Sequence, residues 1–332
     1  MATSTTRRTF VGASLAIAGV WGAPWSRSAR AQAKYPARPI RVICPYAPGA
    51  TTDALSRIVA QGLSAELGGS SVIVENRAGA GGNIGSAAAA AADPDGYTLL
   101  LGAMGPLSVN AAMYPKLGFD PERDLSPLAT IASIPLTLVV NPKFGVSDLK
   151  DLIEKARRSP ELATYASAGS GTPMHLATEL LAREAKVALR HVPYRGSAPA
   201  MNDVVAGHAP FMFDTVLNTL PQIKAGNVSA LAVSSAERLP ELKDVPTLKE
   251  AGYDVVVSGW YGILTQAKVA GEIRDTLSAA LARVVAREDV RSKLAQLGSV
   301  PVDPDPSGLA RLIREEAARW QPLVRAVGIK AE

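Results

Sequence analysis

Apolar and polar positions in the first third of the chain repeat in two alternating ways. Short apolar runs predict strands, and longer stretches with apolar residues three and four positions apart predict helices. The order strand, helix, strand, helix, strand is typical of a parallel sheet covered by helices and joined by right-handed crossovers. The strands are expected at 40–44, 72–75 and 98–103, and the helices at 52–67 and 82–92.

A second alternating series follows a proline- and turn-rich passage at 114–127. It begins with an apolar run and a helix that Ser147 is expected to cap, and the chain then closes with three helical stretches. The pattern therefore predicts a second α/β region and a helical C-terminus. The expected elements are strands at 136–140, 164–166, 189–192, 211–213 and 231–233, and helices at 147–156, 199–206, 273–286, 290–297 and 309–324, with a further helix that begins at Pro173.

The two series predict an α/β fold of two domains, each a mostly parallel sheet flanked by helices. We expect residues 34–135 with 256–332 to form domain I and residues 136–255 to form domain II. The chain would cross between them in two extended segments, near 133–141 and 255–263, and these crossings would form the hinge. Ligands of open α/β sheets bind beyond the carboxyl ends of the strands, so the loops at those ends are the candidates for a site.

One Gly-rich loop follows the first predicted strand and opens a helix. The first N–H groups of a helix have no partner inside the helix, and the helix dipole is positive at that end, so such a loop attracts anions. The alternative is a well-formed turn without a ligand, in which Asp53 caps N–H groups instead of contacting a ligand amino group. The candidate ligand residues of this first loop are Tyr46, Pro48, Gly49, Ala50, Thr51, Thr52 and Asp53.

A second Gly-rich loop follows the strand at 164–166, and a helix begins at Pro173 with Thr172 as its cap. If both loops face one cleft, they could hold a small carboxylate from two sides. His175 lies in the first turns of this helix, where a lone histidine is more often a structural hydrogen-bonding group than a catalyst. The candidate ligand residues of this second loop are Ser167, Ala168, Gly169, Ser170, Gly171, Thr172 and His175.

Two later strand ends add further candidates. Tyr194 belongs to another strand-to-helix loop, and Asp214 ends an apolar strand, where it either caps the next helix or faces the cleft. A Gly-rich segment at 77–85 also follows a strand, but Ile84 occupies the position of the third glycine of a dinucleotide motif. We therefore interpret that segment as a turn and predict no cofactor.

The N-terminus carries the features of an export signal. Arg7 and Arg8 precede an apolar stretch at 10–23 and a small-x-small cleavage pattern, so residues 1–31 are predicted to be removed, with cleavage after Ala33 as the alternative. The paired arginines fit a twin-arginine signal or an ordinary Sec signal, and both remain open. The mature protein is then expected outside the cytoplasm, in the periplasm.

Charge and composition exclude several classes of function. Residues 1–31 hold four arginines and no acidic residue, so the formal charge falls from +5 to +5 − 4 = +1 without them. A nearly neutral chain argues against nucleic-acid binding. Cys44, the single cysteine, excludes an intramolecular disulfide, and with three histidines it makes a metal site a poor prospect. No Gly-x-Ser-x-Gly elbow occurs, so we expect a binding protein and no enzyme.

Several motifs in a fixed order resemble the exported solute receptors of the tripartite tricarboxylate transporter family, also called Bug-type receptors. Each motif alone is weak, but their order along most of the chain is specific. They are Tyr35-Pro36-x-Arg38-Pro39-Ile40, Pro48-Gly49-x-x-x-Asp53, Val74-Glu75-Asn76-Arg77-x-Gly79-x-Gly81-Gly82, Asp95-Gly96-Tyr97-Thr98-Leu99, Gly169-x-Gly171-Thr172-x-x-His175-Leu176, Val192-Pro193-Tyr194-x-Gly196-x-x-Pro199-Ala200 and Met212-Phe213-Asp214.

The resemblance implies a periplasmic binding protein that closes like a flytrap on a small organic acid or an amino acid. The two Gly-rich loops would reach the ligand carboxylate, partly through ordered waters, and Asp214 would be a selectivity contact. The receptor, expected as a monomer, would then dock on a two-component membrane permease. There are two alternatives. One is a sensor that signals ligand occupancy, and the other is an exported enzyme that uses a serine or His175.

Two departures from the family pattern bear on the ligand. The family often has Pro-Gly-Gly where this chain has Pro48-Gly49-Ala50, so the first loop is expected to be stiffer. It often has Gly-x-His-x-x-x-Asn after the third strand, whereas residues 105–110 read Gly-Pro-Leu-Ser-Val-Asn. Both changes would line the cleft, so the ligand is expected to differ from a simple tricarboxylate.

Overall fold

The computed structural model describes residues 35–49 and 51–330, so the predicted signal at 1–31 lies outside the described residues. Within those described ranges, no helix combines the length and the apolar run needed to cross a membrane. The strands are β1 (Ile40–Cys44), β2 (Val72–Asn76), β3 (Thr98–Ala103), β4 (Leu125–Val140), β5 (Thr164–Ser167), β6 (Arg190–Pro193), β7 (Phe211–Thr215), β8 (Ser229–Val233) and β9 (Ser258–Gln266).

Helices alternate with these strands, as the hydrophobic pattern predicts. The predicted helices are found with shifts of a few residues at their ends. They are α1 (Thr51–Glu66), α2 (Asn83–Ala90), α3 (Pro121–Asp124), α4 (Leu149–Arg158), α5 (Pro173–Glu184), α6 (Ser197–Ala206), α7 (Val216–Lys224), α8 (Gly271–Ala286), α9 (Glu288–Gln296) and α10 (Pro306–Val327).

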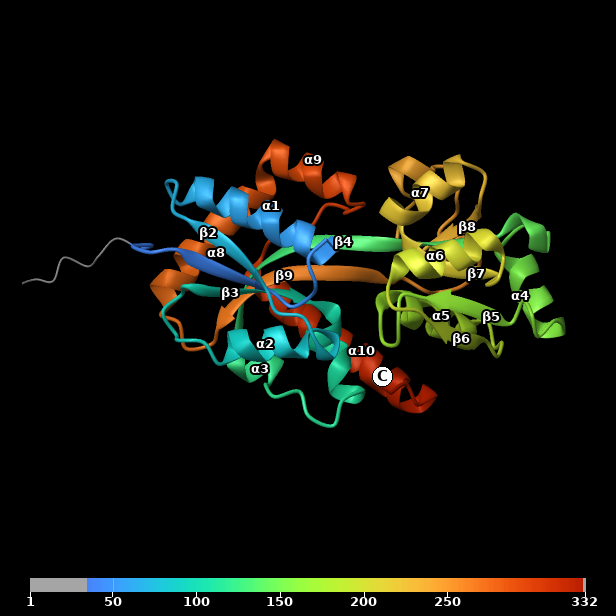
Figure 1. The fold of residues 1–332 in the computed structure, drawn as a ribbon, viewed down its shortest axis with the longest axis horizontal. Helices are drawn as coiled ribbons and strands as arrows, with labels where there is room; N and C mark the ends of the chain where they lie inside the picture. Colours follow the sequence, from blue (N-terminus) through green and yellow to red (C-terminus); the bar gives the residue numbers. More distant parts are fainter. Residues whose placement is uncertain (1–34, 50, 331–332) are drawn as a thin grey trace, which may run out of the picture. The chain divides into compact units, whose positions relative to one another are not determined.

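The strands lie in the order β2-β1-β3-β9-β4-β7-β5-β6, and β8 pairs with β4 (Figure 1). We call β2, β1, β3, β9 and the first part of β4 sheet A, and the last part of β4 with β7, β8, β5 and β6 sheet B. Strands β2, β1 and β3 are parallel, as are β6, β5 and β7. The long strands β4 and β9 are antiparallel to their neighbours, so each sheet is mixed, with its parallel part away from these strands.

Strand β4 changes partners along its length. Its residues from Leu125 to Pro135 pair with β9, and from Leu136 onward they pair with β7 and β8. The predicted extended crossing near 133–141 is therefore the point where one continuous strand passes from sheet A to sheet B. That residues 34–135 with 256–332 and residues 136–255 move as two domains about this point stays a prediction.

Alternating burial fixes sheet A between two layers of helices. In β3, Leu99 and Leu101 pack in an apolar cluster with residues of α1 and α8, while Leu100 faces the cluster that contains Trp320 of α10. Figure 1 shows α1, α8 and α9 on one side of sheet A and α2 and α10 on the other. Because both faces are covered, every residue of β3 is buried, as expected for a strand at the centre of an α/β sheet.

Two local predictions were wrong. Helix α4 is capped by Asp148, whose carboxylate accepts from the Asp151 N–H at 2.9 Å, and Ser147 instead donates its own N–H to the Asp151 carboxylate. This reciprocal pair satisfies two N–H groups, so it is a better helix start than a cap at Ser147. The passage before 127 is also not all turn, because β4 begins at Leu125.

Candidate functional site

A pocket of about 290 Å³ lies at the loops that follow β1, β3, β5 and β6. It therefore occupies the carboxyl ends of parallel strands from both sheets, as expected for an α/β protein. Of the residues predicted from the sequence, seven line it: Tyr46, Thr51, Thr52, Ala168, Ser170, Gly171 and Thr172. Both Gly-rich loops thus contribute to the same pocket.

The first turns of three helices also meet at this pocket. Thr51 and Thr52 begin α1, Met174 lies in the first turn of α5, and Ser197 begins α6. The first N–H groups of a helix have no intrahelical partner, and each N-terminus carries roughly half a positive charge. The arrangement can therefore hold an anion without a basic side chain.

Asp53 holds the first loop in place through hydrogen bonds and does not line the pocket. Its carboxylate accepts from Gly49 N at 3.0 Å, from Asn76 Nδ2 at 2.9 Å and from Arg57 Nε at 3.0 Å. The hydrogen bond from the Arg57 guanidinium lowers the pKa of Asp53 to about 2. Of the two roles that the sequence allowed for Asp53, the structure favours the capping role.

The other residues of the first loop shape its turn. Gly49 has a φ of +86°, a conformation that favours glycine, and neither Pro48 nor Gly49 lines the pocket. Ala50 lies outside the described residues. Tyr46 does line the pocket, and its hydroxyl donates to the Gly81 carbonyl at 3.4 Å. The loop is therefore held in place before any ligand arrives.

The second loop is held by its own hydroxyl groups. Thr172 caps α5 as predicted, with its Oγ1 accepting from His175 N at 3.4 Å and donating to the Gly169 carbonyl at 2.7 Å. Ser167 is fully buried, and its Oγ accepts from Gly169 N at 3.1 Å and lies 2.6 Å from His191 Nε2. Neither Ser167 nor Gly169 lines the pocket, so both shape the loop from behind.

His175 is buried beneath the same loop. Its Nδ1 accepts from Gly171 N at 3.1 Å, and its ring stacks on His191 with the centroids 3.7 Å apart. Burial, with a smaller effect from His191, lowers the pKa of His175 to about 3. The ring is therefore neutral over the ordinary pH range, which leaves Nδ1 free to accept and makes His175 a positioning residue for Gly171.

Replacing His175 by alanine is expected to weaken solute binding about fivefold, because a hydrogen bond that fixes the loop is worth about 1 kcal/mol. His175→Asn places Oδ1 near the position of Nδ1 and should keep most of the affinity. Calorimetric titration of both variants checks this. Equal losses in the two variants would show that the Gly171 hydrogen bond is not the reason.

Asp214 lies beneath the first turn of α6 and outside the pocket lining. Its Oδ1 accepts from Thr215 N at 2.7 Å and from Ser197 Oγ at 3.0 Å, and Asn218 Nδ2 contacts both of its oxygens. It is fully buried, and burial raises its pKa to about 6. A direct contact of Asp214 with a ligand therefore stays a prediction, and in this structure Asp214 reaches the pocket only through Ser197.

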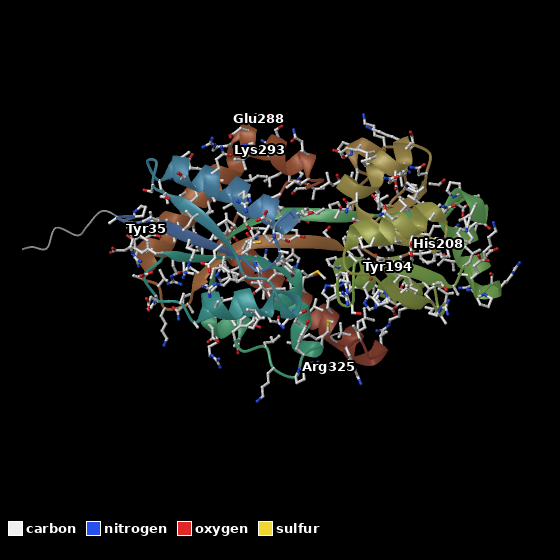
Figure 2. All side chains as sticks on the ribbon, in the orientation of Figure 1. Tyr35, Tyr194, His208, Glu288, Lys293 and Arg325 are labelled. Atoms are coloured by element: carbon white, nitrogen blue, oxygen red, sulfur yellow. The ribbon has the colours of Figure 1, made fainter. Side chains whose placement is uncertain are left out.

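Tyr194, labelled in Figure 2, does not line the pocket and instead bonds to a residue of α6. Its hydroxyl donates to Asp203 Oδ2 at 2.6 Å, and burial, followed by this hydrogen bond, raises its pKa to about 12. Gly196 and Ser197 are the residues of the loop between β6 and α6 that line the pocket. Tyr194 therefore anchors the loop to α6.

The sequence reasoning missed most of the apolar lining. Trp260 and Tyr261 come from β9, the predicted crossing segment at 255–263, so a Trp-Tyr pair in such a segment was a usable signal. The methionines carry no comparable signal, because methionine is common in ordinary cores. The lining residues that were not expected include Met104, Met113, Tyr114, Met174, Ser197, Trp260 and Tyr261, whereas Gly105 and Asn110 come from the stretch 105–110 that was expected to line the cleft.

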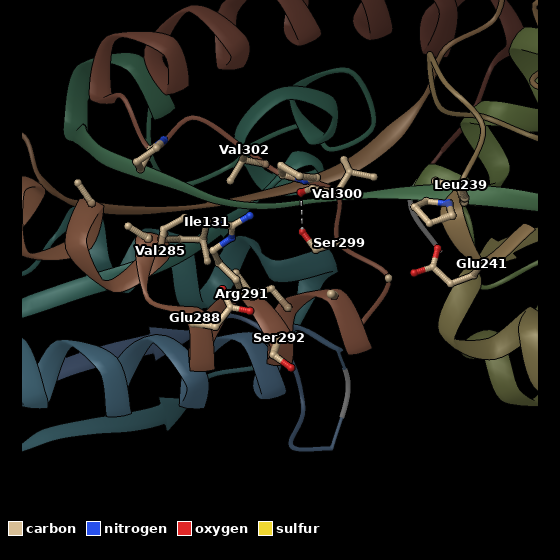
Figure 3. A pocket seen from close by; sticks show the side chains of 18 residues that line it. Ile131, Leu239, Glu241, Val285, Glu288, Arg291, Ser292, Ser299, Val300 and Val302 are labelled. Carbon is tan, nitrogen blue, oxygen red and sulfur yellow. Dashed lines mark hydrogen bonds between the residues drawn. The ribbon is translucent and has the colours of Figure 1, made fainter. Parts of the chain in front are cut away.

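A second pocket, of about 540 Å³, lies apart from the Gly-rich loops (Figure 3). Arg291 and Glu288 of α9 lie on one side of it, and Leu239 and Glu241 lie on the other. Its described lining residues include none from the loops after β1, β5 or β6. Size alone therefore does not identify the ligand site, because the smaller pocket is the one that both predicted Gly-rich loops line.

Within the described part of the chain, no group of three metal-ligating side chains comes together. Ser167 and His175 are buried and do not line the pocket, whereas Ser170 and Ser197 do line it.

Comparison with known proteins gives a family. The model of the tripartite tricarboxylate transporter family receptors matches residues 55–329. A protein from a Pseudomonas species, named for the tcbD-tcbE intergenic region, is 39% identical over 95% of this chain and 94% of its own length. The protein BugT of Bordetella pertussis is 35% identical over 95% of this chain and 98% of its own.

Solved structures agree with this chain in fold, and two of them hold a carboxylate. An R. palustris protein with adipate is 32% identical, with a TM-score of 0.79 over 89% of this chain and 99% of that one. MatC from Rhodopseudomonas palustris with bound malate is 33% identical, with a TM-score of 0.76 over 87% and 100%. The periplasmic binding protein BugD is 32% identical, with a TM-score of 0.76 over 90% and 100%. These neighbours are solute-binding receptors with an α/β fold.

Proposed function

Because this chain belongs to the tripartite tricarboxylate transporter receptor family, we propose that it is a periplasmic receptor that captures a small carboxylate-bearing solute in the 290 Å³ pocket. The carboxylate lies between the first turns of α1 and α5. The observation that carries this proposal is the meeting of both Gly-rich loops in one pocket with two helix N-termini aimed at it. Adipate and malate, bound by two neighbours, are carboxylates of suitable size.

The roles of the loops follow from their contacts. Thr51 and Thr52 present N–H groups and hydroxyls from one side, and Thr172 and the Met174 N–H from the other. Because these groups come from loops on sheet A and on sheet B, a ligand that contacts both favours a conformation in which the two sheets are close. Capture is then a hinge motion about β4 and β9.

Export and delivery complete the proposal. Residues 1–31 direct the chain to the periplasm, and the loaded receptor hands its solute to a two-component membrane permease, as expected of the family. Binding without turnover fits a pocket whose described lining lacks histidine, cysteine and acidic side chains. The receptor acts as a monomer in this scheme.

Thermal denaturation with a panel of carboxylates, amino acids and neutral sugars tests the function. The purified protein is first unfolded and refolded to remove any bound solute. A carboxylate at about a thousand times its Kd should stabilise the fold by roughly 4 kcal/mol, whereas the sugars should not. Stabilisation by sugars but by none of the acids would overturn the proposal.

Thr172→Ala provides the matched test of the site. The variant loses the cap of α5 and should bind its solute about fivefold more weakly, since a cap is worth about 1 kcal/mol. Thr178→Ala is the control, because the Thr178 hydroxyl bonds only within α5, to the Met174 carbonyl at 2.9 Å, and does not line the pocket. Equal losses of affinity in both variants would contradict the site assignment.

A further inference from the structure

The pocket is unusual for an anion site in the character of its side chains. Its described lining contains no lysine, arginine, histidine, aspartate or glutamate. Seven of its described lining residues are instead methionine or aromatic. These are Met104, Met113 and Met174 with Tyr46, Tyr114, Trp260 and Tyr261.

The number of anionic groups that this pocket can balance is small. The N-termini of α1 and α5 supply roughly half a positive charge each, which together balance about one carboxylate. The third N-terminus, that of α6, already faces the buried carboxyl of Asp214 through Ser197, whose hydroxyl donates to Asp214 Oδ1 at 3.0 Å. A second carboxylate on the ligand would therefore be buried without a counter-charge.

The methionine and aromatic residues that line the pocket suit a ligand with a flat apolar body. Met113 is 9% exposed and Trp260 is 3% exposed, so both are held among other side chains and present only part of their surface. Methionine sulfur and aromatic faces pack favourably against aromatic rings. The volume of about 290 Å³ is at the lower limit of ligand pockets, which limits the ligand to a small molecule.

Asn110 adds one polar requirement. It is 4% exposed, and its Nδ2 donates to the Gly81 carbonyl at 3.1 Å and to Asn83 Oδ1 at 2.7 Å. Because the Gly81 carbonyl can only accept, the amide nitrogen must face it, and Oδ1 is the atom left over. Among the described residues no donor reaches this Oδ1. A ligand hydroxyl or N–H would satisfy it, whereas a carboxylate would be repelled.

We propose that the solute is a monocarboxylate with a flat apolar body that carries a hydroxyl or N–H donor for Asn110. This inference rests on the proposed function, because it assumes that a carboxylate is held at the N-termini of α1 and α5. It narrows the ligand from carboxylates in general to small aromatic or similarly flat acids. It also makes Asn110 the residue that distinguishes hydroxylated from unsubstituted acids.

Calorimetric titration of the refolded protein with five probes tests the ligand class. The probes are benzoate, 3-hydroxybenzoate, 4-hydroxybenzoate, terephthalate and adipate. One of the hydroxybenzoates should bind tightest, benzoate about tenfold more weakly, and both dicarboxylates at least about a hundredfold more weakly. If adipate or terephthalate binds tightest, the ligand class is wrong although the receptor function stands. If no acid binds, both proposals fail.

Two variants test the residues named. Asn110→Leu should remove the tenfold preference for hydroxybenzoate over benzoate, and because the two ligands are compared within one variant, a general loss of affinity does not obscure the result. Met174→Arg supplies a cation beside the pocket and should improve terephthalate binding at least about tenfold. Leu217→Ala, an exposed substitution on α7, is the control. An unchanged preference in Asn110→Leu would overturn the role of Asn110.

Discussion

Gly171→Ala is expected to weaken solute binding about thirtyfold, which corresponds to about 2 kcal/mol. Gly171 has a φ of +74°, where a side chain costs roughly 1–2 kcal/mol. A Cβ at this position would also meet the sulfur and the methyl carbon of Met113. The flexible Met113 side chain can move away, but it lines the pocket, so its movement takes space from the ligand. Calorimetric titration measures the loss.

Two further variants separate the strain from the steric effect. Gly145→Ala has a similar φ, +62°, and no atom near its added Cβ, so it should lower the free energy of unfolding and leave affinity unchanged. In a double-mutant cycle, Gly171→Ala should cost much less affinity in the Met113→Ala background than in the natural protein, because no Met113 side chain is left to be displaced. A loss that is the same with and without Met113 would contradict the steric explanation.

The free energy of unfolding of Asp214→Asn, measured relative to that of the natural protein, is expected to rise by about 3 kcal/mol in total between pH 4 and pH 7. Burial raises the pKa of Asp214 from 3.8 to about 6, so between these values the folded state holds a proton that the unfolded state releases. The natural protein therefore loses stability as the pH rises through about 6, and the uncharged asparagine does not. Each pKa unit corresponds to about 1.4 kcal/mol.

Urea denaturation at pH 4, 5, 6 and 7 measures this difference in the free energy of unfolding. Asparagine keeps an oxygen for the Thr215 N–H and the Ser197 hydroxyl, so the fold is not expected to change. Asp244→Asn, which changes an exposed aspartate, should stay parallel to the natural protein at every pH. A difference between Asp214→Asn and the natural protein that does not vary with pH would mean that Asp214 is ionised as readily as an exposed aspartate.

The hydrophobic pattern predicted the order of strands and helices well, because each element buries one or both faces and the spacing of its apolar residues records this. The hydrophobic pattern failed for β4, a single strand that pairs first in sheet A and then in sheet B. Strand β4 contains Ser133 and two prolines, so its full length from Leu125 is not visible as a single apolar run. Its antiparallel pairing with β9, more than 100 residues later, depends on contacts that no local pattern encodes.

The positions of the two loops could be predicted from the sequence. Which of their residues line the pocket and which hold the loop in place could not. Glycines followed by a helix start identified both loops, and Thr172 caps α5 as expected. The sequence could not show that Asp53 bonds Arg57 and Asn76, or that His175 accepts from Gly171, because these partners are fixed by the packing of side chains. Asp53 and His175, which could have contacted a ligand, thus hold the loops in position instead. Methionine and aromatic residues line the pocket.

The most direct test of the account is a crystal structure of the protein with the tightest-binding carboxylate of the titration. The account predicts density for the carboxylate within hydrogen-bond distance of N–H groups in the first turns of α1 and α5, with the ligand body between Met113 and Trp260. Density in the 540 Å³ pocket beside α9, or a carboxylate turned toward Asn110, would contradict it.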